Sequence, residues 1–341
     1  MKTLTVSIAA YNVENFLLET LESLNDRRIL SDVEVLIVND GSTDNTEKIA
    51  QQYCERFPET FRLISKENGG HGSTINRGLR EAKGKFFKVI DGDDLVDTEL
   101  FVSFVERLKV ADADIVFTSY CCIDMKGNRY EDDFIKRNGV NPYKYLIDNK
   151  VYNLSTDKID SYVIGLSTLA IKTCLLRDNN VRITEHCYYV DIEFVMWCLG
   201  MSKSAIFYNM PLYLYRKDPK GNNSISKANM IKNVDMQKKV CQQAIKIYEY
   251  FTEKSLTTSH LNLLFERIIN SVGATFRTYL LLNDSRQRVM IFDKSIKKES
   301  MQVWQKLEDD SFISKLRCCC YILTPFIGLL YKIYLLRKGK I

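Results

Sequence analysis

The chain has 341 residues, of which 45% are hydrophobic and 27% charged, so it can bury a large core and form about two globular units. A formal net charge of +5 is too small to indicate nucleic-acid binding, and we expect no nucleic-acid partner. The ten cysteines form no CxxC pair, which argues against a disulfide framework or a zinc site and favours reduced thiols in the cytoplasm. The apolar run at residues 3–10 is too short for a signal peptide.

The order of the predicted elements indicates the fold of residues 1–120. Strands are predicted at 3–10, 33–40, 61–67, 85–91 and 113–120, and helices at 13–24, 42–57, 72–84 and 97–110. Ser42 or Thr43 is predicted to cap the second helix, and Asp94 or Asp97 the fourth. Strands that alternate with helices are joined by right-handed crossovers, which predicts a doubly wound sheet with parallel strands.

The alternation weakens beyond residue 125. Residues 126–160 are polar and predict loops with a short helix, whereas residues 161–176 are apolar again. A helix is predicted at 188–200 and a strand at 204–217, in which Pro211 indicates an edge or a bend. From residue 227 to about 308, the pattern is that of lysine-rich amphipathic helices.

The stretch FFKVIDGDDLVD, residues 86–97, places Asp91, Asp93 and Asp94 at the end of a predicted buried strand. Ligands of open α/β sheets bind outside the carboxyl ends of the strands, so these carboxylates should share a rim with residues 10–12 and 39–41. A solvated turn explains DGDD equally well in isolation. The position at the rim favours a site for Mg²⁺ or Mn²⁺, which bind through one or two carboxylates together with substrate phosphates.

Five stretches of the sequence resemble glycosyltransferase family 2, whose members are inverting enzymes of GT-A fold that use nucleotide-sugars. They are VSIAAYNVENFLLETLESL (6–24), VEVLIVNDGSTDNT (33–46), NGGHGSTINRGLREAKGKFFKVIDGDD (68–94), YYVDIEF (188–194) and PLYLYRKDPKGNNSIS (211–226). The resemblance covers residues 1–226 and implies a Rossmann-like, doubly wound mixed sheet. Residues 1–120 are then expected to bind the nucleotide-sugar and 121–226 to face the acceptor. A helical C-terminal region would follow at 227–312 and a tail at 313–341.

The resemblance also implies roles for individual residues. Asp40 matches the aspartate that hydrogen-bonds the nucleotide base. Asp91 and Asp93 match the DxD motif, in which the first aspartate faces the ribose and a metal-bound water and the second binds Mn²⁺ or Mg²⁺. The other positions expected at the nucleotide-sugar are Ala10, Tyr11, Asn12, Glu14, Gly70, Asn76 and Gly92, with Gly78 in the same segment as Gly70.

Asp191 matches the catalytic base of the family at the start of the acceptor-side helix. A carboxylate in that place can take the proton of an attacking hydroxyl, and a single displacement inverts the anomeric centre. The sequence departs from the family at Val190, where relatives often have glutamate, and this leaves the acceptor contacts open. The alternative for Asp191 is a surface aspartate on an amphipathic helix.

Three further residues are candidates for acceptor or loop contacts. His71 lies in the loop NGGHGS, and His186 precedes the helix of Asp191; for both, an exposed loop histidine is the alternative. Arg216 and the following KDPKGNNS resemble a mobile loop that closes over the diphosphate in relatives, and a charged hairpin is the alternative there.

The tail CCCYILTPFIGLLYKIYLLRKGK, residues 318–340, is the most apolar part of the chain. Its uninterrupted apolar run is shorter than the ~20 residues that span a bilayer as a helix. Tyrosines and basic residues suit a helix lying on anionic lipid; they are Tyr321, Tyr331, Tyr334, Arg317, Lys332, Arg337, Lys338 and Lys340. We therefore predict peripheral membrane contact, with packing on the catalytic domain or in a homo-oligomer as the alternative.

These observations predict a metal-dependent inverting glycosyltransferase that moves a sugar, from a UDP-sugar by family frequency, to a hydroxyl of a saccharide or polyprenyl-linked saccharide. Family analogy places it in bacterial surface-polysaccharide synthesis, in the cytoplasm at the inner face of the cell membrane. One alternative is a sugar nucleotidyltransferase, although no glycine-and-basic phosphate loop follows the first strand. The other is a non-catalytic module that binds nucleotide-sugars.

Overall fold

The computed structural model describes residues 2–131, 140–217 and 226–337. The chain divides into two compact units, an N-terminal unit of residues 1–219 and a C-terminal unit of residues 220–341. Each unit has its own set of buried side chains. The candidate site residues, from Ala10 to Arg216, all belong to the N-terminal unit.

The N-terminal unit is built on one mixed sheet, with ten strands among the described residues. The strands are β1 (Leu4–Ala10), β2 (Val33–Asn39), β3 (Phe61–Ser65), β4 (Phe86–Asp91), β5 (Leu95–Val96), β6 (Ile115–Ile123), β7 (Arg129–Tyr130), β8 (Val151–Asn153), β9 (Leu169–Lys172) and β10 (Ser204–Arg216). Their order is β3-β2-β1-β4-β9-β6-β10-β5, with β7 paired to β6 and β8 to β10. This confirms the predicted Rossmann-like mixed sheet.

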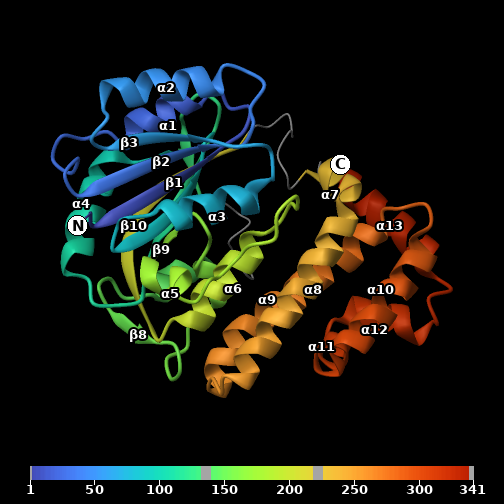
Figure 1. Ribbon diagram of the computed structural model, residues 1–341. Helices are drawn as coiled ribbons and strands as arrows, with labels where there is room; N and C mark the ends of the chain where they lie inside the picture. The colour runs from blue at the N-terminus through green and yellow to red at the C-terminus, as the bar shows by residue number, and fades with distance from the viewer. Residues whose placement is uncertain (1, 132–139, 218–225, 338–341) are drawn as a thin grey trace. The chain divides into compact units, whose positions relative to one another are not determined.

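Helices cover both faces of this sheet (Figure 1). They are α1 (Leu17–Ser23), α2 (Thr46–Arg56), α3 (His71–Glu81), α4 (Thr98–Val110), α5 (Thr173–Arg177) and α6 (Asp191–Met201). Leu4, Val6 and Ile8 of β1 pack in one core cluster with side chains of α1, α2 and α4. The intervening Ser7 faces α3, where a Cβ at Gly78 would lie 2.0 Å from the Ser7 hydroxyl. Burial on both faces explains why the first strands are apolar along most of their length.

The sheet departs from a simple parallel order at β9. The strands β3, β2, β1 and β4 are parallel neighbours, but β9 then runs antiparallel to both β4 and β6. The strand β9 comes from the stretch at 161–176, for which only apolar character was predicted. The following β10 pairs in parallel with β6 and has register shifts around Pro211. Pro211 therefore marks a bend in a strand that lies between β6 and β5, not an edge strand.

Helix capping was predicted correctly in one case and wrongly in the other. The Asp97 carboxylate accepts a hydrogen bond from the Leu100 amide and caps α4. The helix α2 begins at Thr46, later than predicted, and neither Ser42 nor Thr43 caps it. Both residues instead bond to Asn12 after β1, because the loop that carries them closes over the end of that strand.

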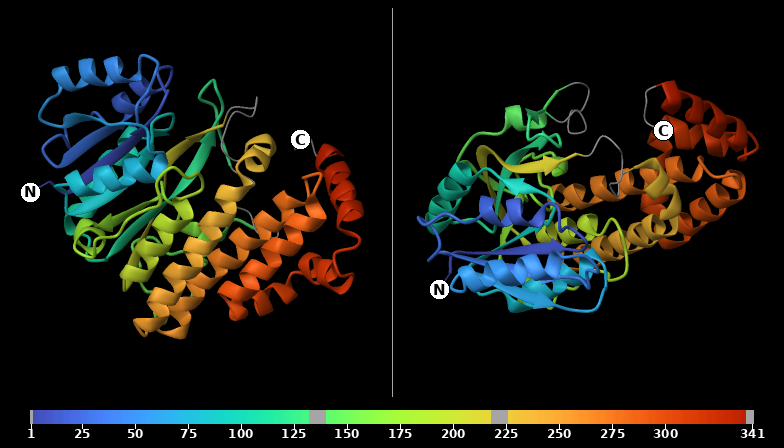
Figure 2. Two further views of the ribbon diagram at one scale, coloured as in Figure 1. Left: turned by 45° about the vertical axis from the view of Figure 1, so that its right-hand side comes forward. Right: turned by 90° about the horizontal axis from the view of Figure 1, so that it is seen from above.

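The described part of the C-terminal unit consists of helices joined by short connections. Its helices are α7 (Lys227–Lys232), α8 (Val234–Glu253), α9 (Thr258–Tyr279), α10 (Ser285–Glu299), α11 (Met301–Lys306), α12 (Ser311–Cys318) and α13 (Thr324–Arg337). The long helices α8 and α9 lie side by side (Figure 2) and bury apolar side chains at helical spacing. A Cβ at Gly328 of α13 would lie 2.6 Å from the Leu280 carbonyl oxygen, so α13 packs closely against the end of α9.

The tail differs from its prediction in two respects. Residues 318–340 do not form one segment, because α12 ends at Cys318 and α13 begins at Thr324. Arg317 is unavailable to lipid: its side chain is 9% exposed and pairs with Asp293 and Glu308, and the Tyr321 hydroxyl also bonds to Asp293. Lys338 and Lys340 lie outside the described residues. Among the described helices, none is both long and apolar enough to cross a membrane.

Candidate active site

The strand ends that the sequence placed at one rim meet there in the structure. In the parallel pairs, Ala10 lies opposite Asn39, and Ala9 lies opposite Asp91. The Asp40 amide donates to the Ala10 carbonyl at 2.9 Å, and the Gly92 amide donates to the Ala9 carbonyl at 2.9 Å. A Cβ at Gly92 would stand 3.0 Å from that carbonyl, so glycine lets the two strand ends approach closely.

The three carboxylates of this rim have different environments. Asp93 is exposed, and the Asp91 side chain is 36% exposed. Asp94 is buried and accepts hydrogen bonds from the Arg216 amide and the Tyr213 hydroxyl. The same hydroxyl lies 3.5 Å from Asp91. Asp94 thus fastens the turn to the end of β10, whereas Asp91 and Asp93 face outward.

Two of the closely spaced carboxylates of the rim have raised pKa values. Desolvation by the surrounding protein, followed by the Asp91 charge, raises the pKa of Asp93 to about 6, even though the residue is exposed. Burial, followed by the charges of Asp93 and Asp91, raises the pKa of Asp94 above its usual range. Two neighbouring carboxylates resist simultaneous ionisation unless a positive charge joins them. A cation bound between Asp91 and Asp93 would relieve this repulsion.

The residues of the rim fit a divalent cation that is shared with a phosphorylated ligand. His71 Nε2 lies 3.3 Å from Asp91 Oδ1, yet this buried nitrogen makes no hydrogen bond within the described structure. Among the described residues, no group of three histidine, cysteine, aspartate or glutamate side chains is arranged to hold a metal. Mg²⁺ needs fewer protein ligands, because it typically binds one or two carboxylates and completes its shell with phosphates and water. Asp91 and Asp93 can supply that pair.

Arg216 is held against the carboxylate turn. Its guanidinium donates to the Asp93 carbonyl at 3.0 Å and to Glu19 at 2.6 Å, and it lies over the ring of Phe16. The Arg216 side chain is 9% exposed. The loop KDPKGNNS, 217–224, was predicted to follow it and close over a diphosphate, but all of this loop after Lys217 lies outside the described part of the chain.

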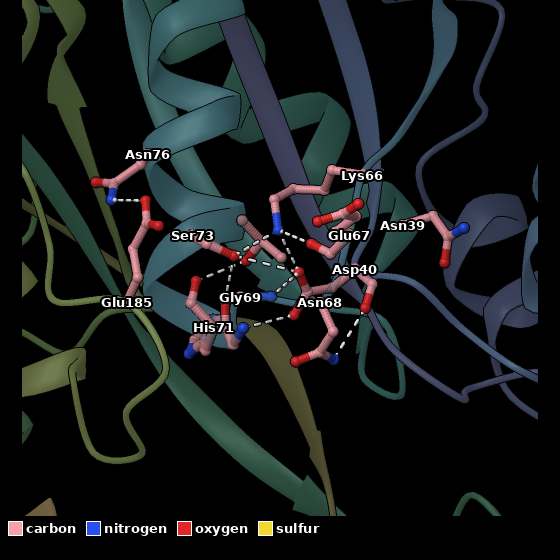
Figure 3. A network of polar contacts seen from close by, with 12 residues as sticks. Asn39, Asp40, Lys66, Glu67, Asn68, Gly69, His71, Ser73, Asn76 and Glu185 are labelled. Carbon is pink, nitrogen blue, oxygen red and sulfur yellow. Dashed lines mark hydrogen bonds and ion pairs between the residues drawn. The ribbon is translucent and has the colours of Figure 1, made fainter.

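Asp40 organises the loop before α3 (Figure 3). Its carboxylate accepts from the Gly69 amide at 2.9 Å, the Gly70 amide at 2.8 Å and Lys66 Nζ at 2.6 Å. The Ser73 hydroxyl lies 3.2 Å away, and the Asp40 side chain is 3% exposed. Both carboxylate oxygens thus have donors within the protein, and the predicted bond from Asp40 to a base stays a prediction.

A second connection joins α3 to the segment that leads into α6. The Asn76 amide group donates to the Ile183 carbonyl at 2.8 Å and to Glu185 at 2.9 Å, while its oxygen accepts from the Ile183 amide. The His186 amide donates to the Gly69 carbonyl at 2.5 Å. Asn76 therefore braces the segment at 183–185, which leads into α6.

Glycine is required where these two segments touch. A Cβ at position 72 would lie 2.0 Å from the Thr184 carbonyl oxygen. Gly70 has a φ of +78°, and a Cβ added there would lie 3.5 Å from the His186 and Cys187 backbone. His186 itself has a φ of +53°, which is rare for a residue with a side chain. The loops at 69–72 and 184–187 therefore fit together through their backbones.

The structure places the remaining predicted residues as follows. Asp191 is exposed and is the first residue of α6, directly after the segment at 184–190. The Asn12 side chain accepts from the Thr43 amide at 2.8 Å, and Glu14 accepts from the Asn45 amide at 2.9 Å, so both hold the loop between β2 and α2. Tyr11 is 50% exposed at the rim, and its ring is open to a ligand.

Sequence reasoning missed Lys66, Ser73 and Tyr213. Lys66 directly follows β3, whose parallel pairing with β2 sets Ser65 opposite Asn39. A basic residue after a strand next to Asp40 was a signal that could have identified Lys66. Tyr213 could not be found in this way, because β10 is far from Asp94 in sequence and only the sheet order brings them together.

Known proteins share both the sequence pattern and the fold. Residues 5–171 match the model of Glycosyl transferase family 2. The domain at residues 5–171 belongs to this family. The uncharacterized glycosyltransferase EpsJ of Bacillus subtilis is 28% identical over 218 residues, which are 63% of this chain and 61% of EpsJ. The minor teichoic acid biosynthesis protein GgaB of the same organism is 24% identical over 67% of this chain, but that region is only 24% of GgaB.

The fold is also similar to that of a protein whose crystal structure is known. Residues 1–349 of S. aureus TarS, crystallised in complex with UDP-GlcNAc, superpose with a TM-score of 0.55 at 17% identity, covering 89% of this chain and 92% of that one. This likeness confirms the predicted GT-A architecture with its helical C-terminal region. The family assignment rests on the sequence match and not on the superposition.

Proposed function

We propose that the protein is a metal-dependent, inverting glycosyltransferase that uses a nucleotide-sugar. The observation that carries the proposal is the rim, where Asp91 and Asp93 face outward at the end of β4 and the exposed Tyr11 follows the neighbouring β1, in a domain of family 2. In this proposal, residues 1–120 bind the donor and 121–226 face the acceptor, as the family pattern implies. Residues 227–312 remain a helical region with no assigned chemistry, and 313–341 remain the tail.

Asp93 would hold Mn²⁺ or Mg²⁺, with Asp91 beside it. When bound, the ion supplies positive charge where negative charge develops on the leaving diphosphate. The protein's own contribution is positional: Arg216 and Asp94 fix the turn that carries the two aspartates. The Asp40 network fixes the neighbouring loop. Such preorganised groups need not rearrange as charge develops, and this lowers the barrier.

Asp191 would be the general base. It is exposed at the first turn of α6, and this is the place that the family pattern gives to the base. The segment that leads into α6 is bonded to Asn76 of α3 and to Gly69 in the loop before α3. Asp191 would take the proton of the acceptor hydroxyl as that oxygen attacks the anomeric carbon. Attack from the side opposite the leaving diphosphate inverts the configuration.

We infer a UDP-sugar donor and an acceptor of bacterial surface-polymer synthesis. Support for the donor comes from TarS, which shares the fold and was crystallised with UDP-GlcNAc and with UDP. Support for the acceptor comes from GgaB and from a teichoic acid poly(glycerol phosphate) polymerase of Staphylococcus epidermidis, 26% identical over 62% of this chain. The acceptor would be a saccharide or a polyprenyl-linked saccharide, used in the cytoplasm at the inner face of the membrane.

The tail would provide the membrane contact. Phe326, Leu329, Leu330 and Ile333 of α13 are 59%, 54%, 51% and 39% exposed. Their spacing of three and four residues puts them on one face of the helix. The helix has 14 residues and is about 21 Å long, too short to span a bilayer. A helix of this kind can lie in the lipid interface with its apolar face inward.

The donor chemistry is tested with a panel of nucleotide-sugars in the presence of Mn²⁺. We expect release of a nucleoside diphosphate from one donor, slowly with water alone and faster with an acceptor extract from a cell surface. Release of pyrophosphate from a sugar phosphate and a nucleoside triphosphate would instead identify a nucleotidyltransferase. Binding of the nucleotide-sugars without any turnover would identify a non-catalytic module.

A further inference from the structure

A basic pocket lies in the N-terminal unit beside the predicted donor rim. It has a volume of about 280 Å³ and lies between the end of β3, the helix α3 and the loop after α5. Its lining includes five basic side chains and one acidic side chain, which are Lys66, Arg77, Arg80, Arg177, Arg182 and Glu185. The rim carboxylates Asp91, Asp93 and Asp94 do not line it.

Three of the five basic groups already have partners. Lys66 pairs with Asp40 and Arg77 with Glu81, and Arg177 donates to the Ala82 carbonyl and lies 3.6 Å from Asp178. On the acidic side of the pocket, Glu185 is bonded to the Asn76 amide group. These carboxylates offset part of the positive charge.

The other two basic groups supply the excess charge. Arg80 and Arg182 are exposed, and neither forms an ion pair with another described residue. They come from α3 and from the loop before Ile183, so two separate elements bring them to one pocket. Arginine presents a planar fork of donors that suits phosphate oxygens. The volume is close to the lower end for small-molecule sites, which leaves room for a phosphate and part of the group it is attached to.

The pocket adjoins both halves of the proposed active site. Lys66 and Ser73 are lining residues that also bond to Asp40 (Figure 3). Glu185 is another lining residue, and it belongs to the segment that leads into α6 and Asp191. A ligand in the pocket therefore lies next to the segment assigned to the acceptor.

We propose that this pocket binds a phosphate group of the acceptor, held by Arg80 and Arg182. The assignment to an acceptor rests on the proposed glycosyltransferase function, whereas the binding of phosphate does not. An acceptor with a phosphodiester or diphosphate near its accepting hydroxyl would gain affinity and orientation from this contact. The chemical step of sugar transfer would be the same with or without this contact.

The first experiment measures anion binding to the full chain by calorimetry, at low ionic strength and without divalent metal. The probes are inorganic pyrophosphate and a short glycerol phosphate oligomer, whose phosphates are diesters. The test variant is Arg80→Gln/Arg182→Gln, and the control is Arg27→Gln/Arg286→Gln. The control changes the net charge equally, through exposed arginines that form no ion pair with other described residues. We expect the test variant to bind the oligomer at least ~10-fold more weakly, since it loses the charge-assisted hydrogen bonds of both arginines, and the control to bind as wild type.

The outcomes separate the sources of phosphate. Equal affinity of wild type, test variant and control for both probes would overturn the proposal. Binding of pyrophosphate but not of the diester oligomer would overturn the assignment to an acceptor and leave a site for free phosphate. Displacement of the oligomer by saturating UDP would likewise overturn it, because the anion would then occupy the donor's site.

The same variants distinguish a failure of this site from a failure of the proposed function. We expect Arg80→Gln/Arg182→Gln to keep the UDP affinity and the donor hydrolysis of wild type. Donor hydrolysis that is absent from wild type, with arginine-dependent oligomer binding intact, would contradict the glycosyltransferase but not the pocket. Loss of UDP affinity in the test variant would place the two arginines at the donor and overturn their role at the acceptor.

Discussion

At the scale of single residues, neighbours in sequence have different roles in the structure. Asp91 and Asp93 face outward, whereas Asp94 is buried against Tyr213 and Arg216. Side chains alternate in direction along β4 and the turn after it. The same short stretch therefore provides two carboxylates that can bind a metal and a third, Asp94, that anchors the turn. The residue types could be recognised from sequence, but their separate environments depend on β10.

Asp40 provides a test at this scale because it holds the loop at 68–70. Asp40→Ala should lower the free energy of unfolding by on the order of 3 kcal/mol, since removing one partner strands a largely buried Lys66 charge. It should also weaken UDP binding with or without metal. Thermal unfolding and calorimetry measure the two effects, with Asp112→Ala at an exposed site as the control. A variant as stable as wild type would show that the network is not structural.

Asp191 tests the assigned base. Asp191→Asn keeps the size of the side chain but cannot take a proton, so transfer should fall by roughly 10²–10⁴. Donor and metal affinity should stay near those of wild type, and the loss should appear in kcat more than in acceptor KM. Steady-state kinetics with Asp112→Asn as the matched control measure this. Near-wild-type kcat would move the base elsewhere, with His186 and Glu193, which lies in the first turn of α6, next to be tested.

At the scale of elements, pattern and spacing predicted the first strands and helices and their shared rim. Parallel neighbours align their carboxyl ends, and this is why residues 10–12, 39–41 and 91–94 could be brought together from sequence. The insertion of β9 between β4 and β6 could not be predicted, because its partners are far away in the chain and four residues carry no clear period. The prediction of the α2 cap was wrong for a related reason, because Ser42 and Thr43 form hydrogen bonds with Asn12, which is distant in sequence.

The strand β4 contains a buried lysine that gives a prediction about pH. Lys88 is fully buried; its Nζ donates to the Ser167 carbonyl and lies 5.9 Å from the ring centroid of Phe104. Burial lowers the pKa of Lys88 to about 7. Between this pH and the unfolded value near 10.5, the unfolded chain binds more protons, so stability rises with pH by up to about 1.4 kcal/mol per pH unit.

Lys88→Met should remove this dependence. Near pH 7 the variant should be more stable than wild type, because it buries no ionisable amine, and the difference should shrink as pH rises toward about 10. Urea unfolding of both proteins at several pH values measures it. Stability profiles that run parallel across the whole range would show that Lys88 does not titrate between the folded and unfolded states.

The helix α13 tests the membrane contact. Point substitutions are preferable to truncation, because Leu316 and Arg317 just before it are integrated into the C-terminal unit. Leu329→Gln/Leu330→Gln should reduce partition onto anionic liposomes by roughly tenfold or more, since each exposed leucine contributes apolar area to the lipid contact. Leu18→Gln/Val110→Gln removes exposed apolar side chains from the N-terminal unit as a control. Equal sedimentation of all three proteins with liposomes would favour a protein partner for this face.

At the scale of the whole molecule, the family and the GT-A sheet were predicted from five motifs in order, and the family match and the superposition confirmed them. Local motifs specify this part well because each lies at a strand end or a helix start. The C-terminal unit was predicted only as helical, since amphipathic spacing reveals helices but not their packing. Arg317 is an example of what the spacing cannot predict. A basic residue beside an apolar run suggests a lipid contact, but Arg317 pairs with Asp293 inside the unit.

The proposed function requires metal-dependent turnover of a nucleotide-sugar at the Asp91–Asp93 rim. The most direct measurement is the rate of nucleoside diphosphate release from the preferred donor by wild type, Asp93→Ala and Asp112→Ala, each with Mn²⁺ and after chelation. We predict that wild type and Asp112→Ala turn over the donor only with Mn²⁺, and that Asp93→Ala loses metal-supported turnover and binds UDP more weakly in Mn²⁺. Metal-supported turnover by Asp93→Ala at the wild-type rate would contradict a metal site at Asp93.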